Sequence, residues 1–110
     1  MVLQGHLDTM LLAVLAEGPA HGYALIDALR VRSDGAFDLP EGTVYPALHR
    51  LERAGLVQSR WSDDGGARRR RVYQLTPSGR PALAERAQGW RAFAAGVDAV
   101  LGGIRCATTE

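Results

Sequence analysis

The chain has 110 residues, of which 46% are apolar and 23% charged, and its 13 basic and 12 acidic side chains give a net charge of +1. This length provides one folded domain with a core and excludes a large two-domain enzyme. The near-neutral total gives no general argument for nucleic acid or membrane, so the distribution of charge along the chain has to supply one.

Arginine supplies every basic residue. Its planar, always-charged guanidinium suits phosphate and carboxylate, although a coding sequence rich in G and C would produce the same bias. No apolar run approaches the ~20 residues of a membrane span, and the N-terminus lacks a secretory signal, so we expect a cytoplasmic protein with no membrane partner. Cys106 is the only cysteine, which excludes an intrachain disulfide and leaves an inert thiol or a redox sensor.

Apolar residues recur at steps of three and four in three successive stretches, each of which predicts an amphipathic helix. These stretches are residues 7–15, 23–29 and 44–51, and each is followed by Gly, Pro or Asp-Gly breakers. Since proline is tolerated in the first helical turn, Pro46 predicts that the third helix starts near residues 42–43, with Thr43 as its cap.

Alternating patterns at residues 56–61 and 71–75 flank turn residues and predict a β-hairpin with a basic tip. Residues 76–78 offer the start of a last helix that continues to about Ile104. Three short helices followed by a hairpin are the arrangement of a winged helix-turn-helix. We therefore expect a mostly α-helical fold with a small β-hairpin. Its parts would be a winged helix-turn-helix DNA-binding domain (1–75), a long C-terminal dimerisation helix (76–105) and a tail (106–110).

The third helix would turn Val44, Leu48 and Leu51 to the core and present the opposite face to a DNA major groove. Residues 42–75 hold seven arginines against three acids, a local balance of +4 that predicts salt-dependent binding to double-stranded DNA. The residues predicted to contact DNA are Thr43, Tyr45, Pro46, His49, Arg50, Arg53, Arg68, Arg69 and Arg70. The alternative is an ordinary solvated face, with Asp63 and Asp64 partly neutralising the tip.

Apolar residues along the last helix form a coiled-coil-like seam. A helix that projects beyond its domain cannot bury such a seam alone, so we expect a homodimer that presents two reading helices to two DNA half-sites. The predicted interface residues are Leu11, Leu83, Ala87, Trp90, Ala94, Val97, Leu101 and Ile104. The alternative is a seam that folds back on its own winged domain.

Trp90 lies among small residues of this seam, and two such rings in a symmetric dimer can leave a gap for a flat guest. The residues predicted for a small aromatic ligand are Trp90, Phe93, Ala94 and Val97. A tryptophan packed in the core is the competing interpretation.

Enzymatic interpretations find no support. The three histidines lack metal-ligand spacing, and no Gly-rich phosphate loop or nucleophile elbow is present. We therefore expect no catalytic residue, metal or cofactor. His21 is interpreted as a capping or hydrogen-bonded structural residue.

Four segments resemble, in order and spacing, the PadR-like transcriptional regulators in their short form with a single C-terminal helix. They are residues 21–23 (HGY), 42–52 (GTVYPALHRLE), 55–57 (GLV) and 73–80 (YQLTPSGR). The resemblance implies a homodimeric repressor that binds an inverted repeat and is released by a small, often phenolic or drug-like, ligand. By position it assigns DNA contacts to Thr43, Tyr45, Pro46, His49 and Arg50 and to the wing-tip arginines. Trp90 is similar to a tryptophan that some multidrug-binding members place at the dimer centre.

Two alternatives to this function share most of these features. A winged helix can serve as a protein-docking module without DNA, an interpretation that the arginine tip disfavours. A DNA-binding dimer without a small-molecule effector differs only at Trp90.

Overall fold

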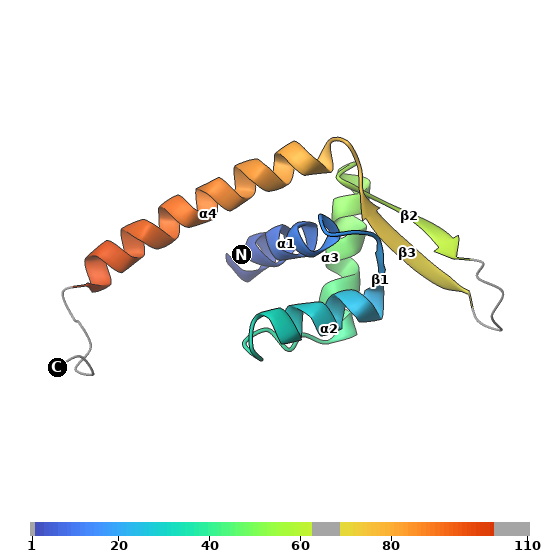
Figure 1. Ribbon diagram of the computed structural model, residues 1–110, viewed down its shortest axis with the longest axis horizontal. Coiled ribbons are helices and arrows are strands. Elements are labelled where there is room, and N and C mark those ends of the chain that lie inside the picture. Colours follow the sequence, from blue (N-terminus) through green and yellow to red (C-terminus); the bar gives the residue numbers. More distant parts are fainter. Residues whose placement is uncertain (1, 63–68, 103–110) are drawn as a thin grey trace.

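The computed structural model describes residues 2–62 and 69–102 of the chain, with side chains from Gly5 onward. The elements are α1 (Val2–Leu15), β1 (Ala20–His21), α2 (Gly22–Arg32), α3 (Glu41–Arg53), β2 (Val57–Ser62), β3 (Arg70–Leu75) and α4 (Gly79–Leu101). Figure 1 shows three short helices beside a small sheet, with the long α4 crossing above α1. The predicted fold class is confirmed. Arg68, Ile104 and Cys106 lie outside the described residues.

The sheet has one strand more than the sequence predicts. β2 and β3 form the expected antiparallel hairpin, from Val57 opposite Leu75 to Ser62 opposite Arg70. β1 pairs with the other edge of β3, which gives the order β1-β3-β2. We call the β2–β3 hairpin the wing. A two-residue strand is too short to show alternation in the sequence, so only the folded backbone shows that β1 joins the start of α2 to the wing.

The core is one cluster contributed mainly by α1, α2 and α3. Its largest fully buried side chains are Leu7, Leu11, Leu12, Leu15, Leu25, Val44, Leu48, Leu51, Val57 and Tyr73. The prediction that Leu11 contacts a partner subunit is therefore wrong, because a side chain with 0% exposure has no surface left to offer. Leu83 of α4 packs against the same cluster and so supports the protomer's own fold.

The start of α3 also differs from the prediction. The backbone N–H groups of Thr43 and Val44 donate to the carbonyl oxygen of Pro40, so Pro40 is the cap and the helix begins at Glu41. Pro46 therefore lies in the second turn. Proline has no N–H, so residue 46 cannot donate the helical hydrogen bond to the Gly42 carbonyl oxygen. Pro46 is on the exposed side of the helix, where water can donate to this carbonyl instead.

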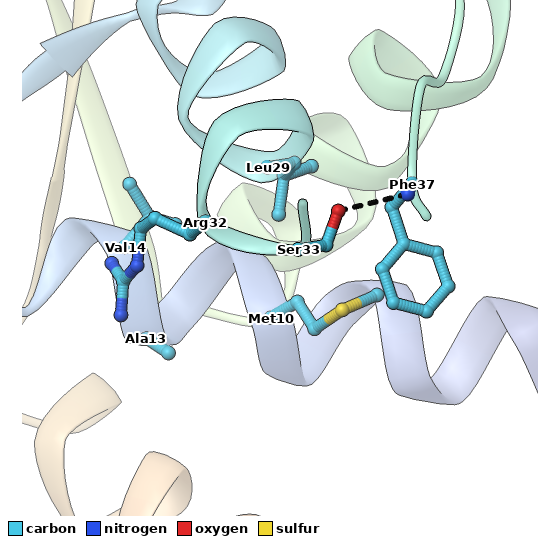
Figure 2. Close-up of a pocket in the computed structure, with 7 residues that line it drawn as sticks. All are labelled: Met10, Ala13, Val14, Leu29, Arg32, Ser33 and Phe37. Carbon is cyan, nitrogen blue, oxygen red and sulfur yellow. Dashed lines mark hydrogen bonds between the residues drawn. The ribbon is translucent and has the colours of Figure 1, made fainter. Parts of the chain in front are cut away.

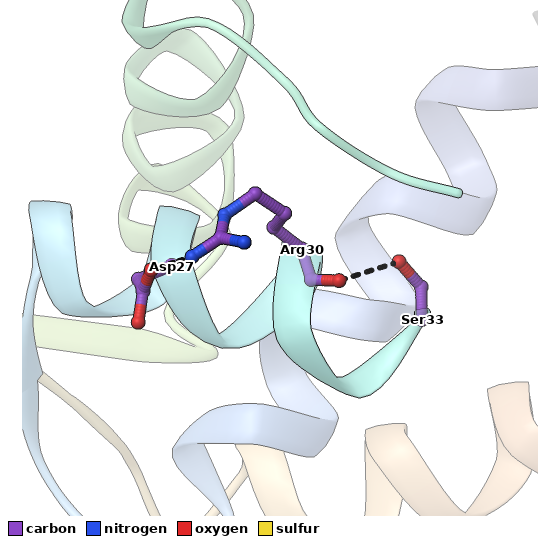
Figure 3. A network of polar contacts seen from close by, with 3 residues as sticks. All are labelled: Asp27, Arg30 and Ser33. Carbon is purple, nitrogen blue, oxygen red and sulfur yellow. Dashed lines mark hydrogen bonds and ion pairs between the residues drawn. The ribbon is translucent and has the colours of Figure 1, made fainter. Parts of the chain in front are cut away.

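The end of α2 is closed by a local polar network (Figure 3). Arg30 pairs with Asp27, and the Ser33 hydroxyl donates to the Arg30 carbonyl oxygen at 3.3 Å. The N–H of Gly35 donates to the same carbonyl at 2.8 Å, and its φ of 87° suits a residue without a Cβ. The chain thereby reverses towards α3.

α4 begins against the core and then leaves it. A Cβ at Gly79 would overlap the Leu56 carbonyl oxygen, so the close approach of α4 to the segment that joins α3 to β2 requires glycine there. The helix then continues beyond the N-terminal end of α1 (Figure 1), which gives the chain an extent of 58 Å along its longest axis. No helix within residues 2–62 and 69–102 is long and apolar enough to cross a membrane.

Candidate nucleic-acid interface

The exposed face of α3 is the first part of the site. Val44, Ala47, Leu48 and Leu51 are buried on one side of the helix. Among the residues predicted to contact DNA, Pro46, His49 and Arg53 are exposed on the other side, and Thr43 is half-buried on its flank. The helix therefore offers a free surface with one imidazole and one guanidinium, groups that suit base edges and phosphates.

Tyr45 has a structural role that its place in the motif did not indicate. Its ring packs so closely on Gly22 of α2 that a Cβ at residue 22 would overlap it. Burial, and secondarily the Glu41 carboxylate, raises the pKa of the Tyr45 hydroxyl, which therefore stays protonated at neutral pH. Tyr45 joins α2 to α3 and also lines the hollow described below.

Arg50 is half-buried on α3 and forms an ion pair with α1. Its Nη2 atom lies 2.9 Å from Oδ1 of Asp8 on α1, and the Asp8 side chain is only 14% exposed. The Nε atom of Arg50 is buried without a hydrogen-bond partner among the described residues. The pair holds α1 against α3, and because 36% of the Arg50 side chain remains exposed, its contact with DNA stays a prediction.

The wing carries exposed cations next to an exposed tryptophan. Arg69, Arg70 and Arg71 are all exposed, and the ring of Trp61 on β2 is 51% exposed. The guanidinium carbons of Arg69 and Arg71 lie 5.4 Å and 5.1 Å from the centroid of the Trp61 ring. These are cation–π distances, so the tryptophan restrains two of the wing arginines.

A chain of hydrogen bonds connects the wing to the last turn of α3. Nε of Arg71 donates to the Ser59 hydroxyl at 2.9 Å, and this hydroxyl donates to Oε2 of Glu52 at 2.6 Å. Sequence reasoning assigned no role to Ser59, Glu52 or Trp61. The periodicity showed that Trp61 lies on a strand, but the side chains it meets come from the opposite strand.

An open hollow of about 640 Å³ separates the wing from the beginnings of α2 and α3. Its wing side is formed by Trp61, Arg69, Arg70 and Arg71, and the facing side includes Tyr23 and Tyr45. Among the described residues, no aspartate or glutamate lines the hollow. The nearby carboxylate of Glu41 accepts a hydrogen bond of 2.6 Å from the Tyr23 hydroxyl.

His21 lies at the same hollow, at the N-cap position of α2, but its side chain makes no capping hydrogen bond. Its Nδ1 atom is buried and has no hydrogen-bond partner within the described residues. Of the two roles interpreted for His21, a side-chain cap is therefore absent, and the residue is structural through its backbone. What the residue contributes is a β1 backbone pairing with Val72 on β3.

The apolar seam of α4 divides into two parts. Trp90 makes an edge-to-face contact with His6 of α1, with 4.8 Å between ring centroids, and keeps 46% of its surface exposed. Beyond it, Phe93, Val97, Val100 and Leu101 are 37% to 79% exposed. The seam therefore does not fold back on its own domain past Trp90.

A shallow apolar hollow of about 390 Å³ lies on this outer part of α4 and includes Phe93 and Val97, two of the four residues predicted for an effector. Trp90 and the half-buried Ala94 are not among the residues that line it. Within a single protomer, the four predicted effector residues thus form no closed pocket.

A further hollow of about 200 Å³ lies between α1 and the end of α2 (Figure 2). Met10, Leu29 and Phe37 form its apolar walls, and the Phe37 N–H donates to the Ser33 hydroxyl at 2.9 Å. Arg32, at the same hollow, pairs with Glu17 at 3.1 Å. This hollow is lined by none of the residues predicted to contact DNA.

Comparison with solved structures gives close matches over most of the chain. A transcriptional regulator from Clostridium thermocellum superposes with a TM-score of 0.80 at 29% identity, covering 88% of this chain and 91% of that one. A PadR family transcription regulator from Clostridium difficile superposes with a TM-score of 0.74 at 32% identity, covering 87% and 98%.

Sequence comparison leads to the same group of proteins. The transcriptional regulator Rv3488 of Mycobacterium tuberculosis is 44% identical over 70 residues, which are 64% of this chain and 62% of that protein. The model of the transcriptional regulator PadR-like family matches residues 11–85, which include every element from α2 to β3. The chain belongs to the PadR-like family of transcriptional regulators, which are winged helix-turn-helix DNA-binding proteins and not enzymes.

Proposed function

We propose that the chain acts as a homodimeric repressor that binds an inverted-repeat operator and is released by a small aromatic or drug-like effector. The observation that carries the DNA-binding part is the hydrogen-bonded chain from Glu52 through Ser59 to Arg71. It couples α3, on which His49 and Arg53 are exposed, to a wing with exposed arginines. In this proposal α3 enters the major groove and the wing contacts the adjacent backbone.

The dimer part is supported by the exposed outer face of α4. Phe93, Val97, Val100 and Leu101 present a continuous apolar surface on a helix that extends beyond the rest of the domain (Figure 1). Such a surface in water favours burial against a second copy. In this proposal residues 1–75 form the DNA-binding unit and α4 is the dimerisation helix, with Ala87, Trp90, Ala94, Val97 and Leu101 at the interface.

The effector part is supported by the aromatic pair Trp90 and Phe93, whose ring centroids are 6.0 Å apart. Two such pairs brought together by dimerisation would offer flat apolar walls to an aromatic ligand, and Ala94 and Val97 leave space beside them. Such a ligand releases DNA only if it binds the DNA-incompetent dimer more tightly than the competent one.

The decisive experiment is fluorescence anisotropy of a labelled duplex from the region upstream of the gene, against a scrambled duplex, at two salt concentrations. Tighter and salt-sensitive binding to the upstream duplex is the expected result, because phosphate contacts release counterions. Failure to bind either duplex would favour the protein-docking alternative. Repression is then tested by transcription from the same promoter in vitro, with and without the protein.

A further inference from the structure

The wing has two faces, and one of them runs from the core to the solvent. Val57 and Tyr73 lie at its inner end with 1% exposure each. Because side chains alternate along a strand, Ser59, Trp61 and Arg71 lie on the same face further out. Tyr73 anchors the inner end of this face in the core, so the position of its outer end is fixed relative to α3.

Trp61 holds the cations at that outer end. It lies directly opposite Arg71 in the strand register, and its ring is within cation–π distance of both Arg71 and Arg69. A free arginine side chain samples many rotamers, and ordering it on binding a ligand reduces affinity. The tryptophan restrains two arginines before any ligand arrives.

The hydrogen bonds from Arg71 to Ser59 and from Ser59 to Glu52 extend this arrangement to the reading helix. Glu52 lies next to Arg53 on the last turn of α3. The wing cations are thus fixed in relation to α3 by side-chain contacts as well as by the backbone.

We propose that the hollow between the wing and the beginnings of α2 and α3 binds a segment of the DNA sugar–phosphate backbone. In this proposal Trp61 is a positioning residue, which holds Arg69 and Arg71 on the cationic side of the hollow. The inference rests on the proposed function. The hollow is open, about 640 Å³ in volume, and lined by three arginines and by no described carboxylate. It lies beside the wing, which is proposed to contact the backbone next to the major groove that α3 enters.

The assignment gives each residue of the hollow a separate task. Arg70 alternates with Arg71 along β3 and so belongs to the other face of the strand, but it also lines the hollow. It shows no polar or ring contact among the described residues, and in this proposal it contacts a phosphate directly. Arg69 and Arg71 contribute charge from positions fixed by Trp61. Tyr23 lines the hollow, and its hydroxyl donates a hydrogen bond to the Glu41 carboxylate.

The test measures the affinity of the full chain for a labelled duplex of arbitrary sequence over a series of salt concentrations. The variants are Trp61→Ala, Trp61→Phe and Arg70→Ala. Arg80→Ala is the matched control, because Arg80 is an exposed arginine on the first turn of α4. Thermal unfolding followed by circular dichroism accompanies each variant.

Arg70→Ala is expected to reduce the slope of log affinity against log salt by about 0.9, the value of one phosphate contact. Trp61→Ala is expected to weaken low-salt binding about tenfold and to reduce the slope, since its two arginines lose their positions. Trp61→Phe keeps an aromatic face and is expected to retain most of the low-salt affinity and most of the salt slope. Arg80→Ala is expected to leave the slope unchanged.

Two results would overturn the inference alone. In the first, the wild type binds the duplex, and Trp61→Ala and Arg70→Ala bind it with the same affinity and the same salt slope as the wild type. In the second, Arg80→Ala loses as much affinity and slope as these two variants. A wild-type protein that binds no duplex at any salt concentration would overturn the proposed function as well. If Trp61→Ala fails to fold, the salt slopes of Trp61→Phe and Arg70→Ala, compared with that of the wild type, still test the inference.

Discussion

The guanidinium of Arg50 on α3 is paired with the carboxylate of Asp8 on α1, with 2.9 Å between Nη2 and Oδ1, across 42 residues of sequence. The two side chains are 36% and 14% exposed. The pair thus lies at the edge of the core and sets how α1 lies against the helix proposed to read DNA.

Asp8→Ala should lower the free energy of unfolding by about 1–3 kcal/mol, because it leaves a partly buried guanidinium without its partner. Urea denaturation measures the effect, and a double-mutant cycle with Arg50→Met isolates the pair. Asp27→Ala is the control, since Asp27 forms an exposed pair with Arg30 that contributes about 0–1 kcal/mol. Equal effects of the two aspartate variants would contradict the structural role of Asp8.

Gly22→Ala should destabilise the fold by about 1–3 kcal/mol, because the added methyl group overlaps the Tyr45 ring. Thermal unfolding provides the comparison. Gly42→Ala is the matched variant: a Cβ at residue 42 meets nothing within 4 Å, and alanine favours the helix. If both variants were equally stable, the close packing of α2 on α3 at Tyr45 would be refuted.

His49→Ala should cost about 1–3 kcal/mol at one position of the operator, if the exposed imidazole contacts a base edge. The measurement compares affinities for a panel of single-base operator variants with wild-type and mutant protein. A loss of the same size on every duplex, including a scrambled one, would instead assign His49 to the backbone.

Leu101→Arg should convert the proposed dimer to a monomer, because a charge placed on the apolar face of α4 cannot be buried without a partner. Leu101 is 50% exposed in the protomer, so the fold itself should tolerate the change. Analytical ultracentrifugation gives the mass. Ala99→Arg, an exposed position about 160° away around the helix at 100° per residue, should leave the dimer intact. A monomeric wild type would refute the proposed interface.

Trp90→Ala should weaken the response to an aromatic effector more than it weakens DNA binding. Trp90 packs on His6 at the junction of α1 and α4, whereas the exposed residues of α3 and the wing belong to other elements. Release of a labelled operator duplex by the ligand measures the response of wild type and of Trp90→Ala. Quenching of tryptophan emission in Trp61→Phe, where Trp90 is the remaining tryptophan, reports ligand binding beside Trp90. Equal losses of ligand response and operator affinity would mean that Trp90 serves the dimer alone.

Local patterns in the sequence were sufficient to predict the order of the major elements. Period-three-and-four spacing predicted α1, α2, α3 and α4, alternation predicted the hairpin, and Gly or Pro residues marked the breaks between them. The sequence also predicted which face of α3 is buried, since Val44, Leu48 and Leu51 share one side. Each of these features depends on residues that are close together along the chain.

The pairing of side chains from distant segments was decided only by the tertiary structure. Three examples are the pairing of Arg50 with Asp8, the burial of Leu11 in the core and the stacking of Trp61 against two arginines. Each depends on how the elements pack. Helical and strand periods fix the direction of a side chain around its own element, but they do not say which neighbour lies there. That neighbour is set by how the hydrophobic faces of all the elements close on one another.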